Sequence, residues 1–122
     1  MNYSAAPQAY KESAVLTATP ERLVVMLYDG MHRFLFQAAV AMREGNIETA
    51  NNRLQRAEAI INELNTTLDM SAGEISHRLR ALYLFCSRHL MQARIRRSPE
   101  MIDEVSKLLD TVGDAWRQIA GG

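Results

Sequence analysis

The chain has 122 residues, 48% hydrophobic and 23% charged, so it is long enough for one domain with its own core and too apolar to be disordered. Its six glycines and three prolines are too few for the turn-rich connections of a β-sandwich or β-barrel. Fourteen basic and fourteen acidic residues cancel, which gives no overall charge for binding nucleic acid or a membrane surface, and the single cysteine excludes an intramolecular disulfide.

Two segments carry the same helix-start pattern, a hydroxyl residue followed by proline and glutamate, at 19–21 and at 98–100. The hydroxyl can cap free N–H groups, proline suits the first helical turn, and glutamate meets the positive end of the helix dipole. Gly45 and Gly73 mark two further breaks. We therefore expect an N-terminal arm over 1–18 and a bundle domain over 19–120, with helices at 20–44, 47–68, 74–97 and 99–120.

Apolar residues repeat in alternating steps of three and four within each expected helix. The pattern is unbroken in the second helix, through Ile47, Ala50, Leu54, Ala57, Ile61, Leu64 and Leu68. In the last helix it runs through Met101, Val105, Leu108, Val112, Ala115 and Ile119, and Leu109 and Trp116 widen the stripe. The first and third helices give Leu23, Leu27, Met31, Phe34, Ala38 and Ala41, and then Ile75, Leu79, Leu82, Cys86, Leu90 and Ala93. Such spacing predicts an all-α fold, an antiparallel up-down four-helix bundle, with Leu54 and Leu108 in its core.

Charge is unevenly distributed between the last two helices. Residues 78–97 include six arginines and no acid, whereas 98–120 include five acids and two basic residues. Since antiparallel neighbours of opposite sign attract, we expect these arginines to attract the acids of the last helix, and the helix dipole also favours the arginines at 94, 96 and 97 near a C-terminus. A phosphate-binding patch is the alternative, and it is less favoured because the chain as a whole carries no net charge.

Two carboxylate–histidine pairs, Glu74 with His77 and Asp29 with His32, have the spacing used by di-metal bundles. They fall at different levels of their helices, and the expected seams of the other two helices carry no carboxylate. We therefore expect no metal site, and a metal-binding bundle stays the least favoured alternative.

Catalysis and cofactor binding are not expected either. Cys86 lies on an apolar seam, where a thiol behaves as a small core residue with a raised pKa, although His89 is close enough in sequence to pair with it. No phosphate-binding or nucleophile motif occurs. The longest apolar run, 23–28, is far shorter than the roughly 20 residues of a membrane span, and the first residues do not resemble a signal peptide. We expect a cytoplasmic protein that is not an enzyme.

The first and third helices carry more apolar residues than one seam requires. These second apolar lines consist of Val25, Phe36 and Val40, and of Leu84, Met91 and Ile95. A lone bundle cannot bury both faces of its helices, so we expect a partner chain or the N-terminal arm, with Tyr10, Val15 and Leu16, to cover them. A homodimer that buries these lines against a second copy, or a weaker self-association, is the alternative.

The segment 17–30, with Tyr28, Asp29 and Gly30 in mid-helix, closely resembles the N-terminal signature of the FliS family of flagellar secretion chaperones. Further matches follow at 68–69, 73–75, 82–83, 104–109 and 115–116, so the resemblance extends from residue 10 to 116. Ala72 departs from the family, which usually has a second glycine there. A mid-helix glycine costs stability, so Gly30 further suggests the close approach of a backbone or bulky side chain.

The resemblance implies a function that the residues alone do not. It implies a chaperone that binds the disordered C-terminal segment of flagellin and prevents its polymerisation before export by the flagellar type III apparatus, whose components are further candidate partners. It also implies that the N-terminal arm, with Tyr10, covers part of the binding surface in the free protein.

Overall fold

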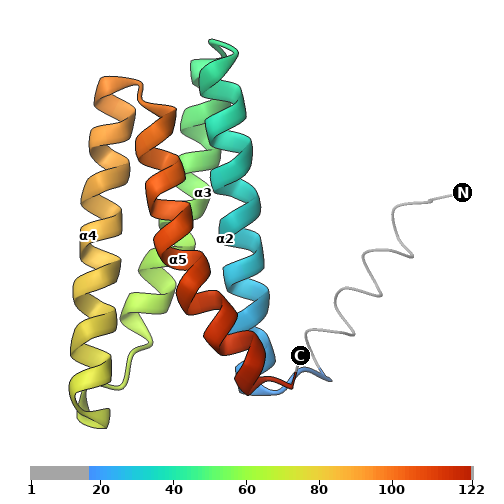
Figure 1. Cartoon of the computed structure of the whole chain (residues 1–122), viewed down its shortest axis with the longest axis vertical. Coiled ribbons are helices and arrows are strands. Elements are labelled where there is room, and N and C mark those ends of the chain that lie inside the picture. Colours follow the sequence, from blue (N-terminus) through green and yellow to red (C-terminus); the bar gives the residue numbers. More distant parts are fainter. Residues whose placement is uncertain (1–16, 122) are drawn as a thin grey trace, which may run out of the picture.

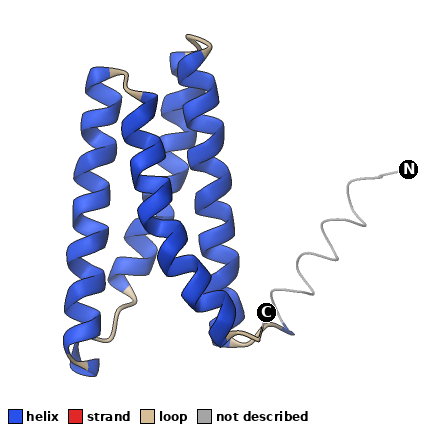
Figure 2. Cartoon of the chain, in the orientation of Figure 1, coloured by secondary structure: helices blue, strands red, loops and turns tan. Residues whose placement is uncertain are grey.

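The computed structural model describes residues 17–121, which form four long helices and one short 3-10 helix (Figure 1). Within this range no residue is in a strand, as Figure 2 shows. The helices are α2 (Pro20–Arg43), α3 (Ile47–Thr66), η1 (Met70–Ala72), α4 (Glu74–Arg96) and α5 (Pro99–Ile119). Successive long helices run in opposite directions, so the predicted all-α, up-down bundle is confirmed.

The helix boundaries follow the predicted caps to within two residues. The Thr19 hydroxyl accepts a hydrogen bond from the N–H of Arg22, and that of Ser98 accepts one from Met101, so both act as N-caps. Gly45 has a φ of 79°, the left-handed conformation that ends α2. Two features were not predicted: the Asn46 side chain caps α3, and η1 lies within the α3–α4 loop.

The four helices are not equivalent in the bundle. Helix α2 packs extensively against α3 and α5, whereas α4 lies on the far side from α2 and packs less closely against the same two helices (Figure 1). The outward faces of α2 and α4 therefore point away from each other.

The core confirms the predicted seam of α3, from Ala50 through Leu54 and Ile61 to Leu64. The prediction for α5 is confirmed at Val105 and Leu109 and wrong at Leu108. Leu108 is 42% exposed, and the buried residues are Ile102, Val105, Leu109 and Gly113. Four further residues of the predicted seams are likewise exposed: Leu23, Ile75, Ala115 and Ile119.

The expected attraction between α4 arginines and α5 acids gives no ion pair within residues 17–121. Acids of α5 pair with α2 instead: Asp103 with Arg43, and Asp110 with His32 at 3.0 Å. Among the ion pairs of residues 17–121, the one between His89 and Glu104, at 2.7 Å, joins α4 to α5. The α4 arginines that pair use other partners: Arg94 bonds Glu58 of α3, and Arg78 bonds Glu74 of its own helix.

Candidate functional site: an apolar groove at one end of the bundle

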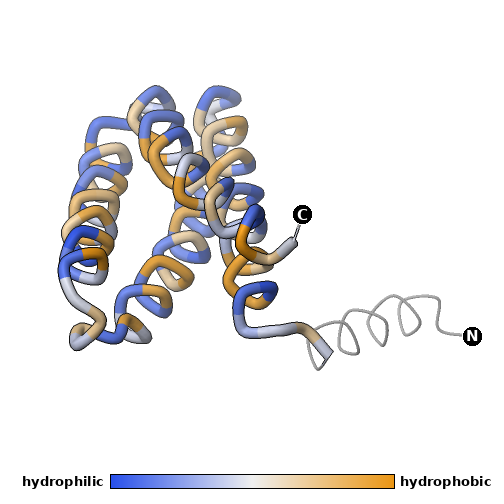
Figure 3. Tube along the Cα trace, turned by 60° about the horizontal axis from the view of Figure 1, so that its bottom comes forward, coloured by the Kyte–Doolittle hydropathy of each residue, from blue (hydrophilic) through white to orange (hydrophobic). Residues whose placement is uncertain are grey.

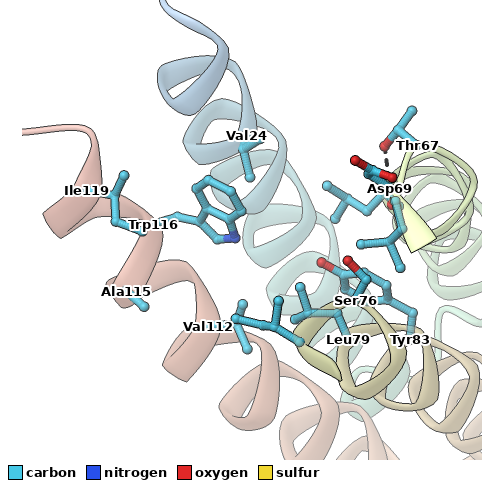
Figure 4. Close-up of a pocket in the computed structure, with 13 residues that line it drawn as sticks. Val24, Thr67, Asp69, Ser76, Leu79, Tyr83, Val112, Ala115, Trp116 and Ile119 are labelled. Atoms are coloured by element: carbon cyan, nitrogen blue, oxygen red, sulfur yellow. Dashed lines mark hydrogen bonds between the residues drawn. The ribbon is translucent and has the colours of Figure 1, made fainter. Parts of the chain in front are cut away.

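A groove of about 430 Å³ opens where α2 and α4 begin and α3 and α5 end. Figure 3 brings this end forward and shows α4 standing apart from α2 and α5 there. The apolar lining residues are Val24, Leu64, Leu68, Ile75, Leu79, Val112, Ala115, Trp116 and Ile119. Four residues with polar atoms, Thr67, Asp69, Ser76 and Tyr83, complete the lining (Figure 4).

The rim of the groove is formed by ends of elements. Ile119 lies at the end of α5 and is 65% exposed, and Ile75 lies in the first turn of α4 and is 66% exposed. The Asp69 carboxylate holds the loop between α3 and α4, since it accepts hydrogen bonds from the N–H and the hydroxyl of Ser71. The Ser71 hydroxyl, followed by its N–H, lowers the pKa of Asp69, so this rim residue is ionised at neutral pH.

One lining residue of the groove, Tyr83, belongs to a buried pair of tyrosines. The hydroxyls of Tyr28, on α2, and Tyr83, on α4, are 2.5 Å apart. Burial raises the pKa of both, and their mutual hydrogen bond adds to the increase for Tyr28, so both stay neutral. This hydrogen bond joins α2 directly to α4, which otherwise packs only loosely against α2.

The tripeptide Tyr28-Asp29-Gly30 connects α2 to all three other helices. Beyond the tyrosine pair, Asp29 accepts a hydrogen bond from Arg117 of α5 at 2.6 Å, and Gly30 faces Ile60 of α3. The expected close approach at Gly30 is not observed, because an added methyl group would meet Ile60 at an ordinary 3.6 Å.

The close approach lies at Gly113 of α5, where an added methyl group would meet the Tyr28 ring at 3.2 Å. Gly113 is therefore the glycine whose missing side chain makes room for the tyrosine pair.

The structure does not join the two predicted second apolar lines into one surface. Val25 is buried, so its predicted exposure is wrong. Phe36 and Val40 are exposed and line a shallow depression between α2 and α3. The other line, on the outward face of α4, consists of the exposed residues Leu84, Met91 and Ile95.

Tyr10, Val15 and Leu16 lie outside the described residues, as does most of the predicted N-terminal arm.

The thiol of Cys86 and the imidazole of His89 do not form a reactive pair. Burial raises the pKa of the Cys86 thiol to about 11, and His89 stacks on Phe85 while bonding Glu104. Within residues 17–121, no three side chains of His, Cys, Asp or Glu are grouped closely enough to hold a metal ion. In the same range, no helix has the length and hydrophobicity of a membrane span.

Sequence reasoning missed the groove because it assigned Leu68, Ile75 and Ile119 to seams between helices. One signal was available: in an up-down bundle these three residues all belong to the same end, where apolar side chains have no further helix turn to pack against. That end therefore carried surplus apolar residues in the sequence.

Comparison with known proteins identifies close relatives. The family model described as "Flagellar protein FliS" matches residues 2–122. The flagellar secretion chaperone FliS of Bacillus subtilis is 39% identical over 110 residues, covering 90% of this chain and 82% of the relative. That of Salmonella typhimurium is 37% identical, covering 93% and 85%.

The fold is also found among solved structures. A bacterial flagellar chaperone, described as "Crystal structure of flagellar chaperone from bacteria", superimposes with a TM-score of 0.76. The match covers 93% of this chain and 96% of that one, at 18% sequence identity.

Proposed function

Since the chain belongs to the FliS family of flagellar proteins, we propose that it is a cytoplasmic export chaperone that binds the C-terminal segment of flagellin and prevents flagellin from polymerising before secretion. It acts by binding rather than by catalysis. The relatives are named flagellar secretion chaperones, which supports a flagellar export substrate as the partner.

The groove is the observation that carries the proposal. Its walls are apolar, and about two-thirds of the surface of each rim residue, Ile75 and Ile119, is exposed to solvent. An amphipathic segment that otherwise packs in a filament gains by burying its apolar face in such a groove. While the segment is held there, that face is unavailable to a neighbouring flagellin subunit.

The second apolar lines are additional contacts in this proposal. Phe36 and Val40 line the depression between α2 and α3, whereas Leu84, Met91 and Ile95 are exposed on α4. Since α2 and α4 lie on opposite sides of the bundle (Figure 1), only a segment that wraps around it reaches both lines. Binding such a disordered segment carries an ordering cost, which keeps the affinity below what the contact area suggests and permits release during export.

Three isoleucines allow a matched test of the groove. Ile119 lines the groove at 65% exposure, and Ile95, on the outward face of α4, is 68% exposed. We expect Ile119→Asp to weaken binding of the flagellin C-terminal segment at least about tenfold in calorimetric titration, because a desolvated carboxylate without a partner is costly. Ile75→Asp, on the opposite rim, is expected to act alike.

The control is Ile95→Asp, for which a smaller loss is expected, as for Met91→Asp and Phe36→Asp. Flagellin lacking its C-terminal segment should not bind. If Ile119→Asp folds and binds as wild type while Met91→Asp abolishes binding, the anchor is the outward face of α4 and the groove proposal is wrong. If wild type binds neither form of flagellin, the proposed function itself is wrong.

A further inference from the structure

The apolar groove contains hydrogen-bonding groups that the protein itself leaves unused. Ser76, in the first turn of α4, is only 5% exposed and lines the groove. Within residues 17–121, no hydrogen bond involves its hydroxyl. Its hydroxyl opens onto the groove and is not among the buried side-chain atoms that lack a partner, so it is accessible to water in the free protein. A segment that covers the groove removes this water and must supply a hydrogen bond in its place.

The surrounding groups add hydrogen-bond donors. Tyr28 and Tyr83 have two hydroxyl protons and one hydrogen bond between them, so one proton has no acceptor among the described residues. The indole N–H of Trp116 also has none in that range, and Figure 4 shows its nitrogen on the side of the ring that faces Ser76 and Tyr83. The N-cap of α4, Gly73, offers no side-chain acceptor to the N–H groups of the first turn.

Charge at the rim restricts which acceptor fits. Asp69 lines the same groove and is ionised at neutral pH, so it disfavours a second carboxylate. A lysine or arginine side chain has no acceptor and leaves the unused donors unpaired. A primary amide carries an acceptor oxygen for these donors and an NH2 group for Ser76 or Asp69.

From these groups we infer that the segment bound in the groove presents a side-chain amide, an asparagine or glutamine set within its apolar face, to Ser76 and Trp116. This inference rests on the proposed binding of flagellin and names what the groove selects within that partner. Ser76 and Trp116 are then specificity-determining residues. A wholly apolar segment leaves their polar atoms buried and unpaired, which rejects it more strongly than a loss of apolar contact does.

Ser76→Ala gives the decisive variant, because it separates binding from stability. The Tm of the free protein should change no more than in a matched serine-to-alanine variant on the same helix, whereas the loss of a hydrogen bond that is buried only in the complex weakens binding of the flagellin C-terminal segment about tenfold. Ser87→Ala is the control: Ser87 is half-buried on the same helix and does not line the groove. It shares the helix-propensity gain of alanine and should bind as wild type. Trp116→Phe keeps the apolar ring without its N–H and should also weaken binding.

A double-mutant cycle identifies the amide. Each asparagine of the flagellin segment is replaced by leucine and each glutamine by methionine, one at a time, and every peptide is titrated into wild type and Ser76→Ala. One replacement should weaken binding to wild type about tenfold and have little effect on the Ser76→Ala variant.

The inference is overturned if Ser76→Ala binds the unchanged segment with wild-type affinity, or if no amide replacement couples to Ser76. Coupling to a serine or threonine of the segment instead overturns the assignment of an amide. These results leave flagellin binding itself intact, whereas failure of wild type to bind the segment removes the proposed function together with this inference.

Discussion

Glycines at two positions of the bundle core have opposite roles, although both lie in mid-helix. Gly30 faces the flexible end of Ile60 at a distance that leaves room for a methyl group, whereas Gly113 packs against the Tyr28 ring. Tyr28 cannot move away easily, because its hydroxyl is bonded to Tyr83. The sequence marked Gly30 as unusual, but periodicity does not report the distance between helices.

We expect Gly30→Ala to raise the free energy of unfolding by about 0.5 to 1 kcal/mol, because alanine is the better helix former and finds space. Gly113→Ala gains the same propensity but crowds the Tyr28 ring, so we expect a net loss of about 1 kcal/mol. Urea unfolding of both variants checks the pair. A stabilised Gly113→Ala protein shows that the tyrosine pair can shift, and a destabilised Gly30→Ala protein restores the close approach expected at Gly30.

The buried thiol of Cys86 predicts a loss of stability at alkaline pH. Its pKa is raised by burial from the ordinary 9.0 to about 11, so between these pH values the folded chain keeps a proton that the unfolded chain releases. The free energy of unfolding therefore falls as pH rises from 9 to 11, by about 2 to 3 kcal/mol for this group.

Urea unfolding at pH 8 to 11 measures this loss, and Cys86→Ala should show a shallower fall across the same range. The fall that remains belongs to Tyr28 and Tyr83, whose pKa values are also raised by burial. Equal slopes for wild type and Cys86→Ala would contradict the assignment to Cys86.

At the scale of the element, the buried face of α3 was predictable and that of α5 only in part, for a reason visible in their residues. Helix α3 has one apolar face, so only one register fits. In α5 the adjacent Leu108 and Leu109 permit two registers, and the true one includes Gly113, which contributes no apolar side chain to the pattern. The groove escaped prediction because it depends on how far α4 stands from α2, which spacing along one helix does not encode.

The two adjacent leucines of α5 test its register. Leu109 is buried, and Leu108 is exposed on the same helix turn. We expect Leu109→Ala to lower the free energy of unfolding by about 2 to 5 kcal/mol, as for Leu54→Ala in α3, because each leaves a cavity in the core. Leu108→Ala should cost less than about 1 kcal/mol. Similar losses at 108 and 109, measured by urea unfolding, are incompatible with this register.

At the scale of the whole molecule, the family resemblance implies that the N-terminal arm covers part of the binding surface in the free protein. Deleting residues 1–16 should then increase binding of a hydrophobic dye and tighten binding of the flagellin segment, because the segment no longer competes with the arm. The same deletion combined with Ile119→Asp is the control, in which the dye increase should shrink. Weaker flagellin binding after the deletion indicates that Tyr10, Val15 and Leu16 contact flagellin directly.

The oligomeric state of the molecule distinguishes a chaperone that binds one flagellin chain from a homodimer. Size-exclusion chromatography with light scattering should give a monomer alone and a one-to-one complex with flagellin. A homodimer that persists with flagellin bound assigns the exposed line of Leu84, Met91 and Ile95 to self-association. A dimer that separates on adding flagellin indicates that both partners compete for that line.

The contacts that tie α2 to the rest of the bundle have a consequence for synthesis of the chain. Tyr28 bonds a residue 55 positions later, His32 one 78 positions later, and Asp29 one 88 positions later. At about 5 to 20 residues per second, the ribosome makes Asp29 roughly 4 to 18 s before Arg117. During that interval α2 and α3 can pair as a hairpin, but the α2 face that receives α5 stays open to other nascent chains. In the proposed role of protecting flagellin from premature assembly, the protein thus passes through its own unprotected stage, and it has no complete groove until Ile119 has been added.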